Sequence, residues 1–247
     1  MTHSTADHDE IQQFSDLAEK WWDSAGEFRP LHQLNPARLA FIRDHVAIHF
    51  GRDPLADSPL KGLKLIDVGC GGGLLTEPMC RLGAEVTGID AGEATIAAAR
   101  QHAEQSGLDI DYRQVLPEDM SREHRRFDVV LNMEVVEHVA DRALFLKSAA
   151  DLVKPGGVMV LSTLNRTLKS LALAKIGAEY ILRWVPVGTH DWKKFVRPSE
   201  LANDLRPAGM EVRDMQGLGY NPADGSWSLC RDLSVNYLMI AVKNADG

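Results

Sequence analysis

Short apolar segments alternate with helical segments over the middle of the chain, and this alternation limits the fold more than any other feature. Apolar runs of strand length occupy 63–68, 85–90, 110–115, 127–132 and 158–163. Strands that alternate with helices form βαβ units, in which a mostly parallel sheet carries helices on both faces. Two later runs, 210–218 and 235–242, have no helical pattern between them and predict an antiparallel hairpin at the sheet edge. We therefore expect a doubly wound, Rossmann-like α/β fold with a seven-stranded sheet.

The N-terminal part of the chain has a different pattern. Residues 1–9 are polar and predict a disordered tail, whereas apolar residues at three- and four-residue spacing predict a helix over 10–23. Asn35-Pro36 combines a capping residue with a proline at the first helical position, so a second helix is expected to begin there. Residues 51–61 contain two prolines and are expected to form a linker. The chain is thus expected to hold one domain, 10–247, which begins with a helical extension over 10–61.

The composition excludes some classes of protein. The 247 residues include 27 Lys and Arg against 35 Asp and Glu, a net charge of −8. Phosphate backbones bind clustered cations, so no nucleic-acid partner is expected for a globally acidic chain. Three cysteines without a Cys-x-x-Cys spacing predict neither a disulfide framework nor a zinc site. The polar first ten residues do not resemble a signal peptide and no run is long enough to span a membrane, so we expect a cytoplasmic protein.

A glycine-rich turn follows the first predicted strand, in the sequence Asp67-Val68-Gly69-Cys70-Gly71-Gly72-Gly73. Glycines allow a tight turn and a close approach of the backbone to a ligand, although such a turn also occurs without a ligand. The dinucleotide fingerprint would place a third glycine at the position of Leu74, which disfavours a nicotinamide cofactor. Asp90 ends the second strand, where a carboxylate accepts hydrogen bonds from a ribose or caps the next helix.

Further motifs complete a recognisable order along the chain. Phe127-Asp128-Val129-Val130 leads to Glu137-His138-Val139, and Val153-Lys154-Pro155-Gly156-Gly157 comes later. Together with the glycine turn and Asp90, this order resembles the class I S-adenosylmethionine-dependent methyltransferases. The segments that carry a closer resemblance lie at both ends of the chain, and they include Trp21-Trp22, Asn35-Pro36, Gly188-Thr189-His190-Asp191 and Tyr220-Asn221-Pro222. They resemble the ubiquinone biosynthesis O-methyltransferase family, and the likeness extends over about Glu10 to Val242.

This resemblance implies a cofactor, a substrate class and a set of binding residues. The cofactor would be S-adenosylmethionine, and the family's binding positions correspond to Arg38, Gly69, Asp90 and Met133, with Gly71 in the same turn. Without the resemblance, Arg38 would be read as a helix-surface residue and Met133 as a core residue. The substrate would be a polyprenylated catechol or quinol, including demethylubiquinol, handled alone or in a ubiquinone biosynthesis complex. Two alternatives stay open: another small aromatic substrate, or a non-catalytic scaffold that binds S-adenosylmethionine.

Three ionisable residues after the fourth strand are candidates for the chemistry. Glu134, Glu137 and His138 have the spacing i, i+3 and i+4, which would place them on one turn of a helix. His138 is the first choice for a general base that removes the phenolic proton, with Glu137 beside it. The same three side chains would alternatively bind Mg²⁺, as the resemblance suggests, or only form the wall of the site. His190, on an expected loop, is a second catalytic candidate.

A basic segment follows the fifth strand. Residues 166–197 contain seven Lys and Arg against two acidic residues, a net charge of +5. On a helix, Lys169, Lys175, Glu179 and Arg183 share one sector and apolar residues fill the remainder, as in an interfacial helix. We expect residues 165–197 to form a helical lid or insertion. Its basic face would also allow peripheral contact with anionic lipid at the inner face of the membrane.

Overall fold

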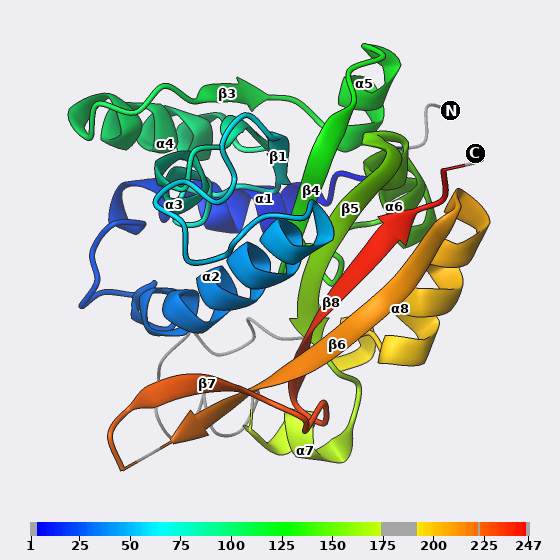
Figure 1. Ribbon diagram of the computed structural model, residues 1–247. Coiled ribbons are helices and arrows are strands. Elements are labelled where there is room, and N and C mark those ends of the chain that lie inside the picture. The colour runs from blue at the N-terminus through cyan, green and yellow to red at the C-terminus, as the bar shows by residue number, and fades with distance from the viewer. Residues whose placement is uncertain (1–3, 174–191, 222, 246–247) are drawn as a thin grey trace.

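One mixed sheet forms the centre of the molecule (Figure 1). The computed structural model describes residues 4–173, 192–221 and 223–245. The strand order is β3-β2-β1-β4-β5-β8-β6-β7. The strands are β1 (Lys64–Val68), β2 (Glu85–Asp90), β3 (Asp111–Gln114), β4 (Phe127–Met133), β5 (Val153–Leu164), β6 (Met210–Asn221), β7 (Ser226–Cys230) and β8 (Asn236–Lys243).

The sheet confirms the doubly wound α/β prediction, with one more strand than expected. Strands β1 to β5 pair with one another in parallel, and β8, β6 and β7 extend the sheet beyond β5 with antiparallel pairs. The additional strand is β7, which pairs with β6 over Gly217–Asn221. It escaped the sequence analysis because it is short and half-exposed, so its residues do not form an apolar run. Strand β5 also begins earlier than expected, and the Pro-Gly segment lies inside it, opposite a register shift in β4.

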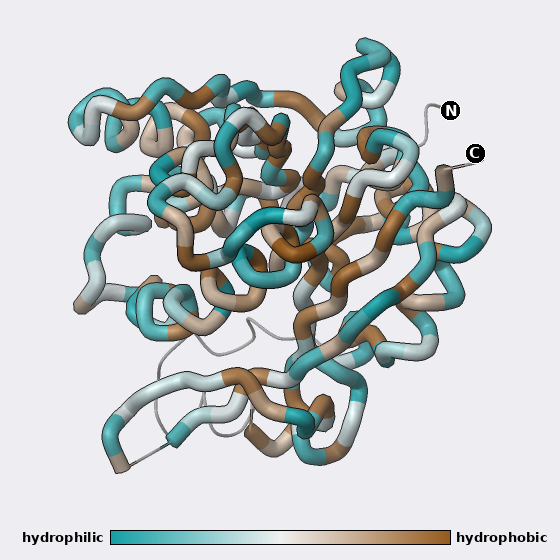
Figure 2. The backbone as a smooth tube through the Cα atoms, viewed as in Figure 1, coloured by the Kyte–Doolittle hydropathy of each residue, from teal (hydrophilic) through white to brown (hydrophobic). Residues whose placement is uncertain are grey.

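Helices cover both faces of the sheet. Helices α2 (Arg29–His49) and α3 (Thr76–Arg81) pack on one face, and α5 (Pro117–Arg122), α6 (Arg142–Asp151) and α8 (Pro198–Leu205) pack on the other. Helix α4 (Glu93–Gln105) packs beside β2 and β3 around Tyr112. The tube in Figure 2 is hydrophobic along the central strands and hydrophilic along many loops, as expected when a sheet is buried on both faces. No described helix is long and apolar enough to cross a membrane.

The N-terminal segment differs from the sequence prediction in three ways. Helix α1 (His8–Ser15) ends before residue 23, and the short 3₁₀-helix η1 (Ala18–Lys20) follows it. Helix α2 begins at Arg29, next to Pro30, so Pro36 lies inside the helix and Asn35 is not its cap. Thr5, expected to belong to a disordered tail, is packed against the domain and is only 2% exposed. All three differences arise from tertiary contacts, which a local sequence pattern does not reveal.

The remaining described helices are short. They are α7 (Leu168–Ser170) and the 3₁₀-helices η3 (Trp192–Lys194) and η4 (Arg206–Ala208). Helices α7 and η3 flank residues 174–191, and the larger part of the predicted lid therefore lies outside the described residues. The parallel strands β1, β2 and β4 end at the same edge of the sheet, and the order reverses between β1 and β4. Ligands of such sheets bind beyond this edge, at the point of reversal.

Candidate active site

The glycine turn after β1 has a backbone that only glycine adopts easily. Gly69 and Gly71 have positive φ angles of 73° and 54°. A Cβ atom on Gly69 would lie 2.5 Å from Val135, and one on Gly71 would lie 2.5 Å from the ring of Trp21. The Trp22 indole donates a hydrogen bond of 2.9 Å to the carbonyl of Gly72. The turn is therefore enclosed by side chains from the N-terminal segment, and glycine is required there for space and for conformation.

Two carboxylates from neighbouring strands flank this turn. Asp90 accepts hydrogen bonds from the backbone N–H of Gly71 at 3.1 Å and of Gly92 at 2.9 Å. The N-cap residue of α4 is Gly92 and not Asp90. Asp90 therefore contributes to the start of this helix only indirectly, by accepting the hydrogen bond from the N–H of Gly92. Asp67 is buried and accepts a bond of 2.7 Å from the Thr76 hydroxyl. Burial raises the pKa of Asp67 to about 6 and also raises the pKa of Asp90.

Arg38 lies inside the molecule and not on a helix surface. It projects from α2, is 3% exposed, and its guanidinium forms an ion pair with Glu134 at 2.9 Å. Its Nε atom is buried and has no hydrogen-bond partner among the described residues. A buried N–H donor without a hydrogen-bond partner lowers the stability of the folded protein. The free Nε–H of Arg38 is therefore suited to bind an anionic group of a ligand.

These residues line one cavity of about 320 Å³. Its volume falls within the range of small-molecule sites. Met133, at the end of β4, contributes to the wall together with Asp67, Asp90 and the glycine turn. The opposite wall comes from the N-terminal segment and α2, and its members are mostly apolar: Ile11, Phe14, Leu17, Trp21, Phe28 and Leu31. All five predicted cofactor positions line this cavity: Arg38, Gly69, Gly71, Asp90 and Met133.

The residues after β4 form an irregular turn and not the expected helix turn. Glu134 adopts the left-handed conformation, with φ of 57°, and the His138 N–H donates to the carbonyl of Val135 at 2.9 Å. Glu134, Glu137 and His138 all line the cavity, and Glu134 forms its ion pair with Arg38 there. Glu137 is 5% exposed, and its Oε2 atom has no hydrogen-bond partner in the described part of the chain. Burial and the nearby charge of Glu134 raise the pKa of Glu137 to about 7.

His138 is bound to a residue that the sequence analysis did not select. Its Nδ1 atom lies 3.0 Å from Oε2 of Glu10, on α1. The imidazole ring also packs edge-on against the ring of Phe14, with 5.4 Å between the two ring centroids. The other carboxylate oxygen of Glu10 accepts a bond of 2.9 Å from Lys194. Burial opposes protonation of His138, but the hydrogen bond to Glu10 and the charge of Glu137 outweigh it and raise the pKa of His138. No local pattern could have identified Glu10, because it lies 128 residues from His138 in the chain.

The predicted Mg²⁺ site does not fit this geometry. Glu134 is engaged by Arg38 and His138 by Glu10, so the two side chains point to different partners. Within the described ranges, no group of three His, Cys, Asp or Glu side chains is arranged to hold a metal ion. A divalent cation needs several oxygen ligands that converge on one point. We therefore assign no step of the chemistry to a cation at these three residues.

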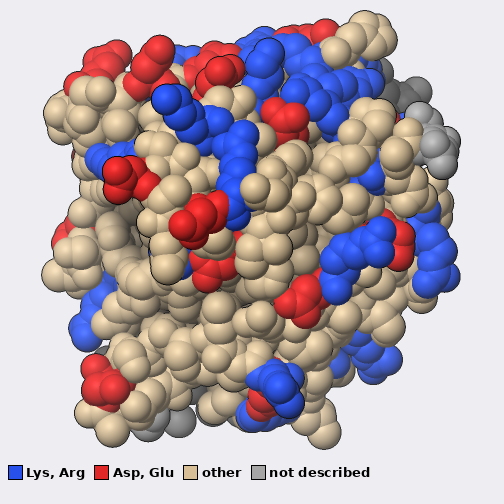
Figure 3. Space-filling view, viewed as in Figure 1, with Lys and Arg blue, Asp and Glu red and all other residues tan. Residues whose placement is uncertain are grey.

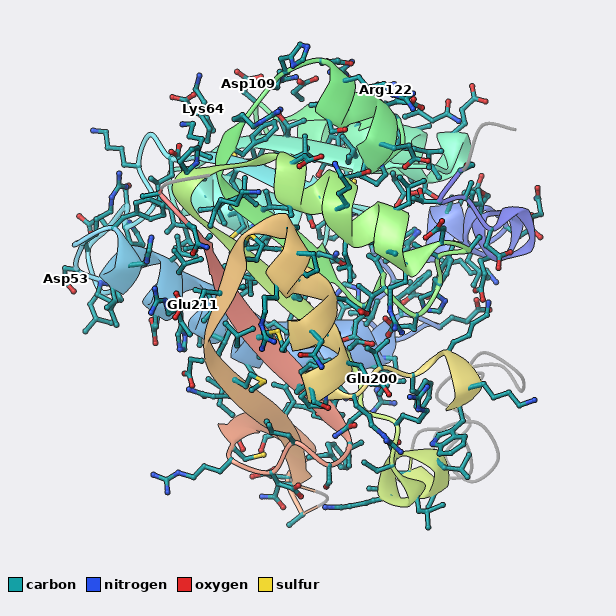
Figure 4. The ribbon with its side chains drawn as sticks, turned by 90° about the vertical axis from the view of Figure 1, so that its right-hand side faces the viewer. Asp53, Lys64, Asp109, Arg122, Glu200 and Glu211 are labelled. Atoms are coloured by element: carbon teal, nitrogen blue, oxygen red, sulfur yellow. The ribbon has the colours of Figure 1, made fainter. Side chains whose placement is uncertain are left out.

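Part of the predicted lid lies outside the described residues, and this includes His190. Three of its described cations form ion pairs within the chain: Arg166 pairs with Glu200, Lys169 with Asp232, and Lys194 with Asp7 and Glu10. Glu200 lies in the first turn of α8 (Figure 4). In Figure 3, basic and acidic side chains are interspersed around α5 and β3. Contact with anionic lipid, a cytoplasmic location and a role for His190 stay predictions from the sequence.

Comparison with known proteins identifies the family to which this chain is similar. A family model described as a methyltransferase domain matches residues 38–214. The ubiquinone biosynthesis O-methyltransferase of Chelativorans sp. (strain BNC1) is 54% identical over 240 residues, which cover 97% of this chain and 95% of that protein. The protein of the same name from Cereibacter sphaeroides (strain ATCC 17025 / ATH 2.4.3) is 55% identical over 241 residues, covering 97% and 98%.

Solved structures with low sequence identity share the fold. Magnesium protoporphyrin IX methyltransferase from Synechocystis PCC 6803, crystallised with S-adenosylmethionine, has a TM-score of 0.60 and 16% identity, covering 98% of this chain and 100% of that one. The [4+2]-cyclase SpnF has a TM-score of 0.56 and 19% identity, covering 83% and 81%. Because a methyltransferase and a cyclase both share this architecture, the fold alone does not specify the reaction.

Proposed function

The chain belongs to the ubiquinone biosynthesis O-methyltransferase family and is an S-adenosylmethionine-dependent methyltransferase, and on this premise we propose that it methylates catechol-type hydroxyls of polyprenylated ubiquinone precursors, including demethylubiquinol. The observation that carries the proposal is the single cavity that joins Gly69 and Asp90 to Glu137 and His138. A scaffold that only binds the cofactor would need the first pair and not the second. Asp90 is proposed to accept the ribose hydroxyls, and Arg38 the cofactor's carboxylate.

We propose His138 as the general base of this reaction. S-adenosylmethionine would supply a methyl group bound to positively charged sulfur. The sulfur is an excellent leaving group because it departs as a neutral thioether. A phenolic hydroxyl has a pKa of roughly 10, so removal of its proton near neutral pH is the part that a side chain must assist. His138 lines the cavity, and its hydrogen bond to Glu10 uses only Nδ1. The other ring nitrogen would accept the proton, while the walls of the cavity align the reacting atoms.

Glu137 is the alternative base. It lies in the same turn, its Oε2 atom is buried without a described partner, and its pKa is raised to about 7. A buried carboxylate of that pKa would also accept a proton near neutral pH. The geometry favours His138 because Glu10 holds the ring and accepts its Nδ1–H, which leaves the imidazole in the tautomer that a base requires.

Turnover with labelled S-adenosylmethionine tests the proposed substrate. The acceptors are a short-tailed demethylubiquinol, its earlier catechol precursor and a simple catechol without a prenyl tail. We expect methylation of the two prenylated acceptors, with a higher kcat/KM than for simple catechol. Equal or faster turnover of simple catechol would favour the small-aromatic alternative. Tight binding of S-adenosylhomocysteine without turnover of any acceptor would instead favour the scaffold.

Substitution of His138 tests the proposed base. His138→Gln is expected to lower kcat by about 100-fold or more, since general bases contribute roughly 10²–10⁴-fold, and to leave the Kd of S-adenosylhomocysteine within about twofold. Glu137→Gln, measured beside it, shows whether the carboxylate has the role instead. The control is His45→Gln, because His45 is also a histidine bound to a carboxylate, Asp214 at 2.8 Å, but does not line the cavity. Near-normal kcat for His138→Gln between pH 6 and 9 would remove it as the base.

A further inference from the structure

We propose that Glu10 is a positioning residue of the active site: it holds the His138 ring so that the ring's other nitrogen faces the substrate hydroxyl. The proposal rests on the function proposed above, in which His138 is the base. It adds a second group beside His138, and this group comes from the N-terminal segment and not from the sheet. The N-terminal segment would then complete the active site and would not only cover it.

The contact between Glu10 and His138 is direct. Glu10 Oε2 lies 3.0 Å from His138 Nδ1, and a carboxylate can only accept, so the ring donates its Nδ1–H. Glu10 Oε1 accepts from Lys194 at 2.9 Å. Because each carboxylate oxygen has its own partner, the carboxylate cannot rotate without losing one of them. Both Glu10 and His138 line the cavity, with side chains about one-fifth exposed.

The segment that carries Glu10 is anchored on both sides of the contact. Before α1, the carboxylate of Glu118 accepts bonds from the N–H of Thr5 at 2.9 Å and from its hydroxyl at 2.7 Å. The carbonyl of Thr5 accepts from the N–H of Ala140, two residues after His138, at 3.1 Å. Within α1, Phe14 contacts the His138 ring edge-on. These contacts hold α1 in place along the turn that carries His138.

The charges around the pair keep Glu10 ionised. The hydrogen bond to His138, opposed by burial and supported by Lys194, lowers the pKa of Glu10 to about 2. The ionisable groups that face His138 are Glu10 from α1 and Glu137 and Glu134 from its own turn, and all three are acidic. Lys194 and Asp7 complete the cluster around Glu10. A carboxylate that stays charged and accepts the Nδ1–H orients a catalytic imidazole and stabilises it once protonated.

The test compares Glu10→Gln with the unmodified protein and with Asp16→Asn. Asp16 is an exposed carboxylate just after α1 whose described hydrogen bond is to Gln12. We expect Glu10→Gln to lower kcat on the order of 10-fold or more, with KM and the Kd of S-adenosylhomocysteine within about twofold. The rising limb of the pH profile of kcat should also move to lower pH, because loss of the carboxylate lowers the pKa of His138. Asp16→Asn should change neither quantity.

Two further readouts separate the possible failures. In NMR spectra, the ring signals of His138, assigned with His138→Gln, should shift in Glu10→Gln whether or not an acceptor is present. Unchanged kcat, pH profile and ring signals in Glu10→Gln, while His138→Gln is slow, would overturn the role of Glu10. If the unmodified protein turns over none of the acceptors, the proposed function fails. In that case, unchanged ring signals in Glu10→Gln would overturn the Glu10–His138 contact as well.

Discussion

The two walls of the cavity are built in different ways. One wall consists of the ends of β1, β2 and β4 with the turns that follow them, and the paired strands hold its residues in register. The other consists of the N-terminal segment, which reaches the first wall through a few long-range contacts. These include Trp22 with Gly72, Thr5 with Glu118, and Glu10 with His138.

This difference separates binding from chemistry. The sheet wall contains Gly69, Asp90 and Met133, three of the residues expected to bind the cofactor, while Arg38 lies on α2. The N-terminal wall contributes Glu10 and Phe14, and both contact His138. Substitutions in the glycine turn of the sheet wall should therefore weaken cofactor binding, whereas substitutions in the segment that carries Glu10 should slow turnover and leave binding nearly unchanged. Three experiments test this division.

The largest effect is expected from Gly69→Ala. The new Cβ would meet Val135 at 2.5 Å in a backbone with φ of 73°, and such strain costs roughly 1–3 kcal/mol. We expect the affinity for S-adenosylhomocysteine to fall about 30-fold or more, measured by calorimetry. Gly107→Ala is the matched control, since Gly107 also has a positive φ, 65°, but nothing lies within 4 Å of its Cβ position. Equal losses in the two variants would mean that backbone strain, and not the cavity, is responsible.

A smaller effect is expected from Thr5→Val, which removes the hydroxyl bound to Glu118 and keeps the shape of the side chain. Loss of a hydrogen bond to a charged group costs roughly 1.5–3 kcal/mol when the partner is buried, but water can reach Glu118 once the segment loosens. We expect kcat to fall about fivefold, faster proteolysis near the N-terminus, and a Kd for S-adenosylhomocysteine within twofold. Ser4→Ala, at the exposed neighbouring residue, should behave like the unmodified protein. A loss of cofactor affinity as large as the loss of kcat would contradict the division between the walls.

The smallest effect is the pH dependence of docking of the N-terminal segment. The pKa of Glu10 is lowered from 4.5, so its contribution is present above pH 4.5 and is lost as the pH falls towards 2. The pKa of His138 is raised from 6.5, so its contribution is complete below pH 6.5 and is lost as the pH rises through the raised value. Protection of the segment from proteolysis should therefore be greatest between these limits and fall roughly two- to fivefold at high pH. In Glu10→Gln the profile should be flat over the same range.

The sequence predicted the sheet wall almost completely. All five parallel strands were found, because strands buried on both faces are continuous apolar runs with clear ends. Gly69, Gly71 and Asp90 were found because the topology places the ends of β1 and β2 side by side. Strand β7 was missed because its exposed residues contain no such run. The helical grouping of Glu134, Glu137 and His138 was wrong because Glu134 is left-handed, a conformation that no spacing rule contains.

The N-terminal wall was the least predictable part. Its helical periodicity was visible from Glu10 onwards, but residues 1–9 were expected to be a disordered tail, although Thr5 is buried. The contact between Glu10 and His138 was not expected either. A polar segment has no pattern that indicates which distant carboxylate or histidine it will meet. Its position depends on hydrogen bonds that exist only when Glu118, Ala140 and Lys194 have already been brought together.

The sequence by itself determined the α/β sheet, the glycine turn and the family, because these depend on local periodicity, local backbone conformation and motif order. Only the tertiary structure decided which partners the charged side chains of the turn after β4 contact. It directed Glu134 to Arg38 and His138 to Glu10, so the three side chains are not gathered for a cation. The physical reason is that the pairing of charged groups depends on their distance in space, and the order of the chain does not give that distance for residues 128 positions apart.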